Sequence, residues 1–244
     1  GTYVAPHAVN LIVHRNNQRL DEDLATVVDH RVPLVITSVG KPGDIADAVH
    51  GYGGTLFHDV TNVRHAQKAL ESRADGLILV CAGAGGHAGT TNPFALVPEV
   101  RSFFDGPVIL SGCISDGRSI RAAQTLGADL AYLGTRFIAT EEANAPPLYK
   151  ETILDSGAAD ITYTPEFSGI PGSYLTKSIV NAGLDPADLL LPGQSANREH
   201  RSGQDKPKAW STIWGAGQGV GTISEVLPAA ELAQRLKAEY EAAA

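Results

Sequence analysis

One histidine stands in a segment that is otherwise built from apolar and small residues. The segment runs from Gly76 to Gly89, begins as a continuous apolar stretch, and ends in glycines and alanines around His87. The apolar stretch is typical of a buried parallel strand, and the small residues let a flat or anionic ligand approach the backbone closely. His87 is the only side chain in this loop that can exchange a proton near neutral pH. We therefore take it as the candidate general base, the alternative being a solvated or structural histidine in a tight turn.

Two further glycine-bearing sequences end apolar stretches one strand–helix unit apart. They are Ser111-Gly112-Cys113 and Leu133-Gly134-Thr135. In barrels of parallel strands, the loops after successive strands often bind a phosphate through backbone amides. Glycine suits such a site because a Cβ would block the phosphate oxygens, and a threonine hydroxyl adds one more donor. The pair predicts a phosphate site, with two ordinary turns as the alternative.

Three other places carry polar or aromatic side chains near apolar stretches. Asn10 could bond the amide edge of a ring system, or it could be a structural polar residue in a strand. His58 and Asp59 are adjacent, and adjacent strand residues point to opposite faces, so a polar strand end is favoured over a functional pair. Trp214, followed by glycines up to Gln218, indicates a lid or wall over a flat ligand.

Apolar stretches and helical patterns alternate along the first half of the chain. The expected strands cover 8–13, 33–38, 55–60, 77–81, 107–111 and 130–133, and the expected helices 20–30, 44–52, 63–72, 96–104 and 117–126. This alternation predicts an α/β fold with a parallel sheet. Because candidate residues follow several successive strands, a (β/α)8 TIM barrel is favoured over an open doubly wound sheet. Only six strands are recognisable, so the first two strands of such a barrel would precede Gly1.

The alternation of strands and helices stops after about residue 141. We divide the chain into a barrel portion over 1–142, a smaller helical lid domain over 143–210, and a return to the barrel with a terminal helix over 211–244. Within the second part, the charged stretch 197–208 is expected to form an exposed loop.

The composition restricts the class of protein and its partners. The chain has 244 residues, is 43% hydrophobic and carries a net charge of −8, as an ordinary soluble globular protein does. No basic stripe is available to neutralise nucleic-acid phosphates, and no apolar stretch approaches the roughly 18 residues that span a bilayer. Cys81 and Cys113 fit reduced thiols in a cytoplasmic protein better than a disulfide. No metal site is expected.

A dinucleotide-binding loop is the main competing interpretation of the histidine segment. Gly83, Gly85 and Ala88 match the looser G-x-G-x-x-A spacing after a strand. However, residues 90–93 end in proline and interrupt a helix there, and no acidic partner for a ribose ends the next strand. The barrel interpretation is therefore preferred.

Taken together, these sequences resemble the FMN-dependent nitronate monooxygenases, formerly called 2-nitropropane dioxygenases. The matching segments lie in collinear order at 8–11, 84–89, 110–112, 127–137 and 216–218. The resemblance implies a TIM barrel that binds FMN, with His87 as the base that removes the proton alpha to a nitro group. It implies a cofactor site in which Asn10 contacts the flavin ring, and whose members are Asn10, Gly85, Gly86, Ser111, Gly112, Cys113, Leu133, Gly134, Thr135 and Gln218.

The sequence also departs from that family. Some members carry a lysine near the flavin where this chain has Asp59, and an acidic residue where it has Gly83. The same superfamily contains flavin-dependent enoyl-thioester reductases. The expected function is oxidation of alkyl nitronates or nitroalkanes with dioxygen. The alternatives are NAD(P)H-dependent reduction of an enoyl or acyl thioester, and a flavin-free barrel remnant or binding module. Expected partners are a small-molecule substrate with dioxygen or NAD(P)H, without nucleic acid or membrane, and a homo-oligomer is left open.

Overall fold

A six-stranded parallel sheet is the largest element of the computed structural model, which describes residues 6–14, 16–193 and 210–243. The strand order β1-β2-β3-β4-β6-β7 follows the sequence without reversal. A doubly wound sheet reverses its order at a switch point, whereas a barrel adds each strand beside the last. The barrel-type fold is therefore confirmed. The strands are β1 (Ala8–Ile12), β2 (Leu34–Ser38), β3 (Thr55–Val60), β4 (Gly76–Val80), β6 (Val108–Ser111) and β7 (Leu130–Tyr132).

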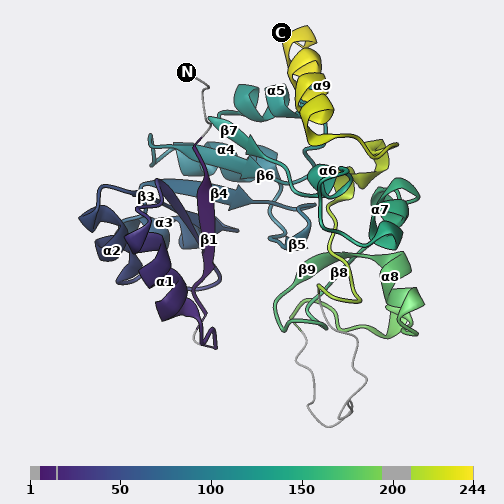
Figure 1. Ribbon diagram of the computed structural model, residues 1–244, viewed down its shortest axis with the longest axis horizontal. Helices are drawn as coiled ribbons and strands as arrows, with labels where there is room; N and C mark the ends of the chain where they lie inside the picture. The colour runs from purple at the N-terminus through teal and green to yellow at the C-terminus, as the bar shows by residue number, and fades with distance from the viewer. Residues whose placement is uncertain (1–5, 15, 194–209, 244) are drawn as a thin grey trace.

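A helix connects each of these strands to the next, and the helices cover the outer face of the sheet (Figure 1). Strand residues such as Leu77 and Val108 pack with helix residues in the outer core. The intervening strand residues, such as Ile78 and Val80, form a separate inner cluster, as the period of two requires. The helices are α1 (Leu20–Asp29), α2 (Ile45–Gly51), α3 (Val63–Glu71), α4 (Pro93–Arg101) and α5 (Gly117–Leu126).

The largest boundary error of the sequence analysis concerns α4, which was expected over 96–104. The Asn92 side chain accepts a hydrogen bond from the Phe94 N–H, and Pro93 occupies the first turn. Both residues are favoured at a helix N-terminus, so the helix begins there and ends at Arg101. The apolar pattern alone places the helix later because its first apolar contacts come after the cap.

The sheet curls into a half-barrel that stays open between its edge strands β1 and β7. Within the described residues, each edge strand pairs with one neighbouring strand only. Large side chains at these edges are correspondingly exposed, with Ile12 at 42%, Leu130 at 58% and Tyr132 at 45%. Burial, and then the charge of Asp59 on β3, raise the pKa of Tyr132 on β7.

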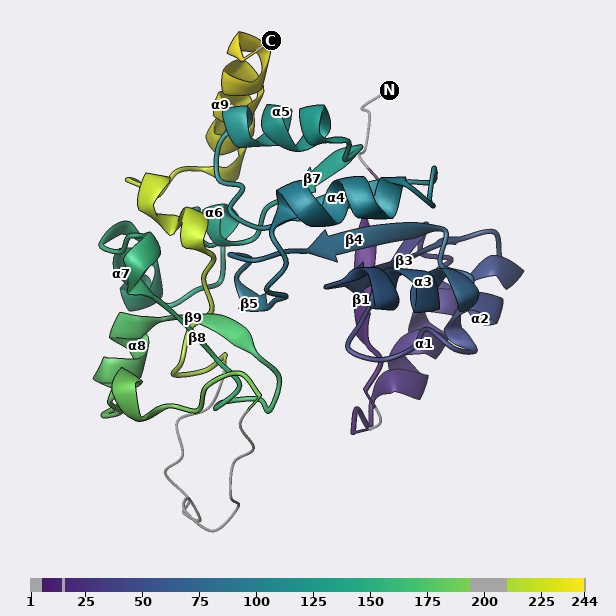
Figure 2. The same ribbon diagram turned by 180° about the vertical axis from the view of Figure 1, so that it is seen from behind.

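A second, three-stranded sheet lies beside the open half-barrel (Figure 2). It has the order β5-β9-β8, formed by β5 (Gly86–His87), β9 (Gly172–Leu175) and β8 (Ile161–Thr164), with antiparallel pairing. The region 143–210, expected to be a helical lid domain, thus contains the strands β8 and β9 besides its helices. His87 also lies in a strand paired with Gly172, not at the tip of a loop. The helices of this part are α6 (Thr135–Ile138), α7 (Pro147–Leu154), α8 (Thr176–Asn181), η1 (Ala158–Asp160) and η2 (Pro186–Asp188).

The C-terminal part returns to the half-barrel. A parallel bridge joins Thr140 to Leu227, η3 (Gln218–Thr222) follows the glycine-rich segment, and α9 (Ala229–Ala242) packs on α5. The Glu239 carboxylate accepts a hydrogen bond from the Gly117 N–H at 2.8 Å. The loop expected over 197–208 lies outside the described residues. Among the residues that are described, none belongs to a helix long and apolar enough to cross a membrane.

Candidate active site

Two cavities meet at strand β5, between the parallel strand ends and the second sheet. His87 lines a cavity of about 810 Å³, whereas its neighbour Gly86 lines one of about 410 Å³. The larger cavity extends to the carboxyl ends of β1, β2 and β3, and the smaller one to those of β6 and β7. The antiparallel pairing of β5 with β9 holds the two residues, and therefore the junction of the cavities, in place.

The smaller cavity collects most of the residues expected to bind the cofactor. None of the described residues that line it carries a charge; their polar groups are hydroxyls, a thiol, the Trp210 indole N–H and the backbone. Gly112 has a φ of +138° and Cys113 a φ of +56°, which turns the chain sharply after β6. A Cβ added at Gly134 would meet nothing within 4 Å, so the space beside that strand end is open to a ligand. The expected residues lining this cavity are Gly85, Gly86, Ser111, Gly112, Cys113, Leu133, Gly134 and Thr135.

The segment 216–218 is fastened to this cavity through its backbone. The Gly217 N–H donates to Thr135 Oγ1 at 2.9 Å, and the Gln218 N–H donates to the Gly83 carbonyl at 2.9 Å. The Thr135 hydroxyl accepts here, so its own proton is left to donate elsewhere. The Gln218 side chain is exposed and lines neither cavity, so the structure does not bring this expected residue to the others.

The hydrogen bonds around His87 assign the proton on its ring. His87 Nε2 lies 2.8 Å from Ser168 Oγ, and the Ser168 hydroxyl donates to the Ile170 carbonyl at 3.0 Å. Because that hydroxyl has one proton, Ser168 accepts from Nε2–H. Nδ1, which has no hydrogen-bond partner within the described residues, then carries the lone pair. Burial lowers the pKa of His87, which keeps the imidazole neutral near pH 7.

A chain of polar side chains crosses the ends of β1, β2 and β3 at the larger cavity. Ser38 Oγ lies 2.9 Å from Asn10 Oδ1 and 2.6 Å from Asp59 Oδ2. One hydroxyl proton cannot serve two acceptor oxygens. Two arrangements resolve the conflict: a protonated Asp59 donates to Ser38, which donates to Asn10, or the Asn10 amide is turned over so that its Nδ2–H donates to Ser38, which donates to an ionised Asp59. Ser38 was not among the residues expected from the sequence.

Burial makes the protonated form of Asp59 accessible closer to neutral pH than it is for an exposed carboxyl group. Burial raises the pKa of its carboxyl to about 6, although the hydrogen bond from Ser38 acts in the opposite direction. Its second oxygen, Oδ1, is buried and has no hydrogen-bond partner within the described part of the chain. Asp59 therefore presents an unpaired oxygen among the residues of the larger cavity.

His58 and Asp59 do not act as a pair, as the alternation of strand side chains predicts. His58 Nδ1 lies 2.7 Å from Thr37 Oγ1, a buried contact, while Asp59 bonds Ser38. Burial lowers the pKa of His58 to about 4. The sequence analysis favoured a polar strand end for both residues; the structure buries His58 against Thr37, and both His58 and Asp59 are among the residues that line the larger cavity.

The expected role of Trp214 as a lid is wrong. It is 9% exposed and stacks on Tyr149 at 5.0 Å between ring centroids, within the core of the C-terminal part. The tryptophan at the cavity is Trp210, which is 52% exposed and meets the His87 ring edge-on at 5.3 Å. Gly86 and Gly215 leave room for it, because a Cβ on either would crowd the indole.

The cysteines and the other residues that commonly bind metals are dispersed in the part of the chain that the structure describes. Cys81 is buried and Cys113 exposed, and both are free. No three His, Cys, Asp or Glu side chains among the described residues gather so that they could hold a metal ion.

With this geometry established, comparison with known proteins identifies relatives. A chain from Staphylococcus haemolyticus, named a probable nitronate monooxygenase, is 33% identical over 62% of this chain and 46% of its own length. A Rhodococcus jostii protein, named (3aS,4S,5R,7aS)-5-hydroxy-7a-methyl-1-oxo-octahydro-1H-indene-4-carboxyl-CoA dehydrogenase, is 30% identical over 65% of this chain and 47% of its own. The chain thus spans about half the length of these curated relatives.

Solved structures and family models agree with the fold. The M276A mutant of FabK from Thermotoga maritima, a TIM-barrel protein, superposes with a TM-score of 0.78 at 25% identity, covering 98% of this chain and 76% of that one. The model of the nitronate monooxygenase family, whose members are flavin enzymes, matches residues 4–239. The chain therefore belongs to the nitronate monooxygenase family.

Proposed function

We propose that this protein is an FMN-dependent oxidoreductase that oxidises alkyl nitronates and nitroalkanes with dioxygen, with His87 as the general base. Membership of the nitronate monooxygenase family supports the reaction class. The observation that carries the assignment of the base is the position of His87, a neutral imidazole with a free Nδ1 at the junction of two cavities.

The smaller cavity fits the phosphate of FMN. Strand ends at Gly112 and Gly134 offer backbone N–H groups, and none of the described lining residues has a carboxylate that would repel an anion. The open space beside Gly134 is where a phosphate oxygen would lie, and the Thr135 hydroxyl has a proton to donate. Asn10, whose amide lies across the half-barrel, would contact the ring. When bound, FMN supplies the acceptor for the electrons released by the substrate.

The residues around His87 prepare it to take a proton from carbon. Ser168 holds the ring through Nε2, so that Nδ1 is the atom that accepts the proton alpha to the nitro group. The imidazolium formed keeps its bond to Ser168. A nitronate has already lost that proton and needs no base. The two substrate forms therefore separate the role of His87 in proton transfer from its other roles.

Replacement of His87 by asparagine tests this role. Asn retains hydrogen bonding but cannot accept a proton, and general-base catalysis typically contributes about 10²–10⁴ in rate. We expect His87→Asn to retain FMN, to lose turnover of a neutral nitroalkane by a factor in that range, and to keep turnover of the nitronate. Oxygen uptake with both substrates on FMN-loaded protein measures this.

The matched control is His30→Asn, at an exposed histidine following α1. It should leave both activities unchanged. An equal loss with both substrates in His87→Asn would remove the base assignment, while a loss of bound FMN would indicate a structural histidine.

A second candidate function is reduction of an enoyl or acyl thioester by NAD(P)H. The size of the larger cavity, about 810 Å³, favours it, because a small nitroalkane would fill only a small part of that volume. The name of the Rhodococcus jostii relative includes a carboxyl-CoA substrate. Rapid anaerobic bleaching of the flavin by NAD(P)H would favour this function over the first. A purified protein that stays colourless after addition of FMN would contradict both.

A further inference from the structure

Three cationic side chains surround the mouth of the larger cavity. Lys41 lies in the loop after β2, and Arg64 and Lys68 lie on α3. All three are exposed and line the cavity that His87 also lines. Arg64 and Lys68 are four residues apart, so they lie on the same face of their helix. The three charges therefore come from two separate elements and face one space.

No carboxylate pairs with these three cations anywhere in the described residues. Elsewhere the protein pairs its charges at the same helical spacing, as in Arg19–Asp23, Arg235–Glu231 and Lys237–Glu241. Two like charges at that spacing destabilise a helix. On α3, by contrast, two positive charges stand at this spacing, although the chain as a whole carries a net charge of −8.

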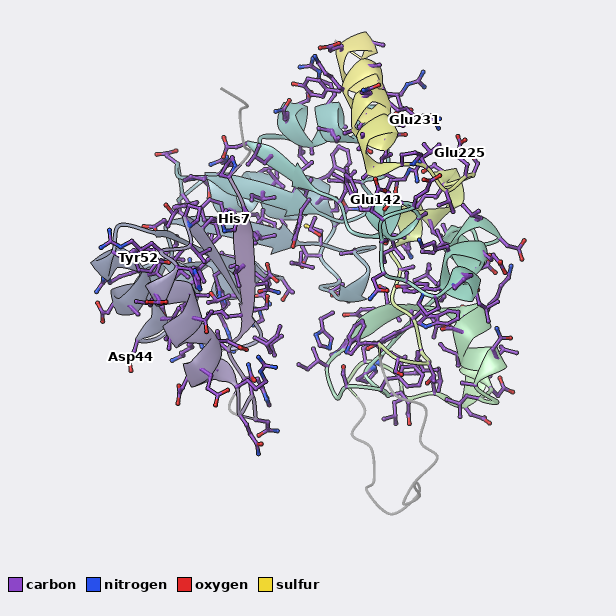
Figure 3. The ribbon with its side chains drawn as sticks, in the orientation of Figure 1. His7, Asp44, Tyr52, Glu142, Glu225 and Glu231 are labelled. Atoms are coloured by element: carbon purple, nitrogen blue, oxygen red, sulfur yellow. The ribbon has the colours of Figure 1, made fainter. Side chains whose placement is uncertain are left out.

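The pKa of a neighbouring histidine agrees with an unpaired positive charge on Lys41, Arg64 and Lys68, which we call the cationic rim. Burial, and then the charges of Arg64 and Lys68, lower the pKa of His65, which lines the same cavity. Among the described residues that line the cavity, Asp59 is the only one with a carboxyl group, and its bonded oxygen contacts Ser38 at the strand ends. Asp44, labelled in Figure 3, is exposed at the start of α2 and does not line the cavity.

We propose that Lys41, Arg64 and Lys68 bind the phosphates of a nucleotide-bearing ligand, coenzyme A in thioester linkage or NADPH, whose reactive end reaches towards His87. Both ligands carry a pyrophosphate and a ribose phosphate at the end remote from the reacting atoms. A cluster of cations at a cavity mouth suits such a group, and the same cavity is lined by these cations and by His87, so one ligand can extend from the one to the other. The placement of the reactive end rests on the proposed function; the phosphate site does not.

The phosphate of FMN is a less suitable occupant of this rim. The uncharged smaller cavity already offers the backbone donors for it, and it lies at the ends of β6 and β7, not at β2 and α3. A nucleic acid would need a longer basic surface than three side chains on an acidic protein.

The test is a binding measurement without turnover on the FMN-loaded protein. Calorimetric titrations use adenosine 3′,5′-bisphosphate, the phosphate pattern of coenzyme A, and adenosine 2′,5′-bisphosphate, the pattern of NADPH. The test variant is Arg64→Gln/Lys68→Gln, and the control is Arg118→Gln/Lys237→Gln, which removes the same charge from α5 and α9. If each charge-assisted contact contributes about tenfold in affinity, the test variant should weaken binding about 100-fold. The control should remain within about twofold.

The outcomes separate the proposal from its competitors. Tighter binding of the 3′,5′ isomer that is lost in the test variant supports a coenzyme A site, and the same result for the 2′,5′ isomer supports an NADPH site. Equal weakening in test and control variants, or no binding of either nucleotide, overturns the proposal. Loss of FMN from the test variant also overturns it, because the rim would then belong to the flavin. Since no turnover is measured, these results do not depend on which oxidation the enzyme performs.

Discussion

The two cavities that meet at β5 are built in different ways. The described residues that line the smaller one offer glycines, hydroxyls and backbone, and none of them is charged. Those that line the larger one include three cations, three histidines and one carboxyl group, and this cavity has about twice the volume, 810 against 410 Å³. A site made from backbone recognises a constant part of a ligand, such as a phosphate, whereas a site made from side chains can differ between related proteins. We therefore expect the smaller cavity to determine the cofactor and the larger one to determine the substrate.

Gly134→Val should have the largest effect, because it changes the smaller cavity, which we expect to bind the cofactor. The added side chain would enter the open space beside the strand end, where the proposed phosphate lies. Nothing in the protein lies within 4 Å of the added Cβ, so the fold should tolerate the change. We expect loss of essentially all bound FMN, measured as flavin absorbance per protein after gel filtration, with an unchanged circular dichroism spectrum.

Gly51→Val provides the matched control for this variant. Gly51 lies in α2, and a Cβ there also meets nothing within 4 Å. It lines neither cavity, so FMN content should be unchanged. Full FMN content in Gly134→Val would place the phosphate elsewhere and would remove the basis for the division between the cavities.

The same difference explains which parts of the site could be predicted from the sequence. The glycines at 112 and 134 follow apolar stretches, so local sequence was enough to propose that they share one site, and both line the smaller cavity. The Ser38–Asp59 contact joins residues from different strands at 2.6 Å, and its meaning depends on counting one proton. Short-range patterns contain neither the register of β2 against β3 nor the burial that raises the pKa of Asp59.

His87 and the tryptophans show the same limit. The type and position of His87 were evident, but its pairing partner Gly172 lies far along the chain, so the strand β5 was taken for a loop. The glycines after Trp214 suggested a ligand. The structure shows that Gly215 instead makes room for Trp210, because a Cβ at Gly215 would crowd the Trp210 indole. The glycines therefore did indicate a close contact with an indole, but the sequence could not show that the indole is that of Trp210 and not that of Trp214.

Paired substitutions of the two tryptophans would sharpen this distinction. Trp214→Ala empties a buried site against Tyr149, and such truncations typically cost about 3–5 kcal/mol of unfolding free energy. Trp210→Ala removes a half-exposed side chain and should cost less than about 1 kcal/mol. Urea denaturation of both variants measures the difference. Equal losses would mean that Trp210 also supports the fold and does not serve mainly as a cavity wall.

Asp59→Asn gives the smallest expected effect and concerns the one carboxyl group in the larger cavity. Burial raises the pKa of Asp59 to about 6, above the roughly 3.9 of an unfolded chain. The native state therefore binds this proton more tightly than the unfolded state does. Its stabilising effect is fully present below about pH 4 and is lost as the pH rises through 6, because the carboxylate must then ionise in a buried position.

Asn is the appropriate replacement because it keeps the shape of the carboxyl group and cannot ionise. At pH 8, where wild-type Asp59 is charged, we expect Asp59→Asn to raise the melting temperature by about 2–4 °C, which corresponds to on the order of 1 kcal/mol for a chain of this size. At pH 4.5 the gain should disappear, since Asp59 is then protonated and Ser38 can donate to Asn10. Thermal unfolding at the two pH values checks this, with Asp160→Asn, at a partly exposed carboxylate in η1, as the control. A pH-independent change would show that Asp59 is ionised throughout. The larger cavity would then hold a permanent negative charge below its cationic rim, and the affinity of that rim for phosphates would be correspondingly weaker.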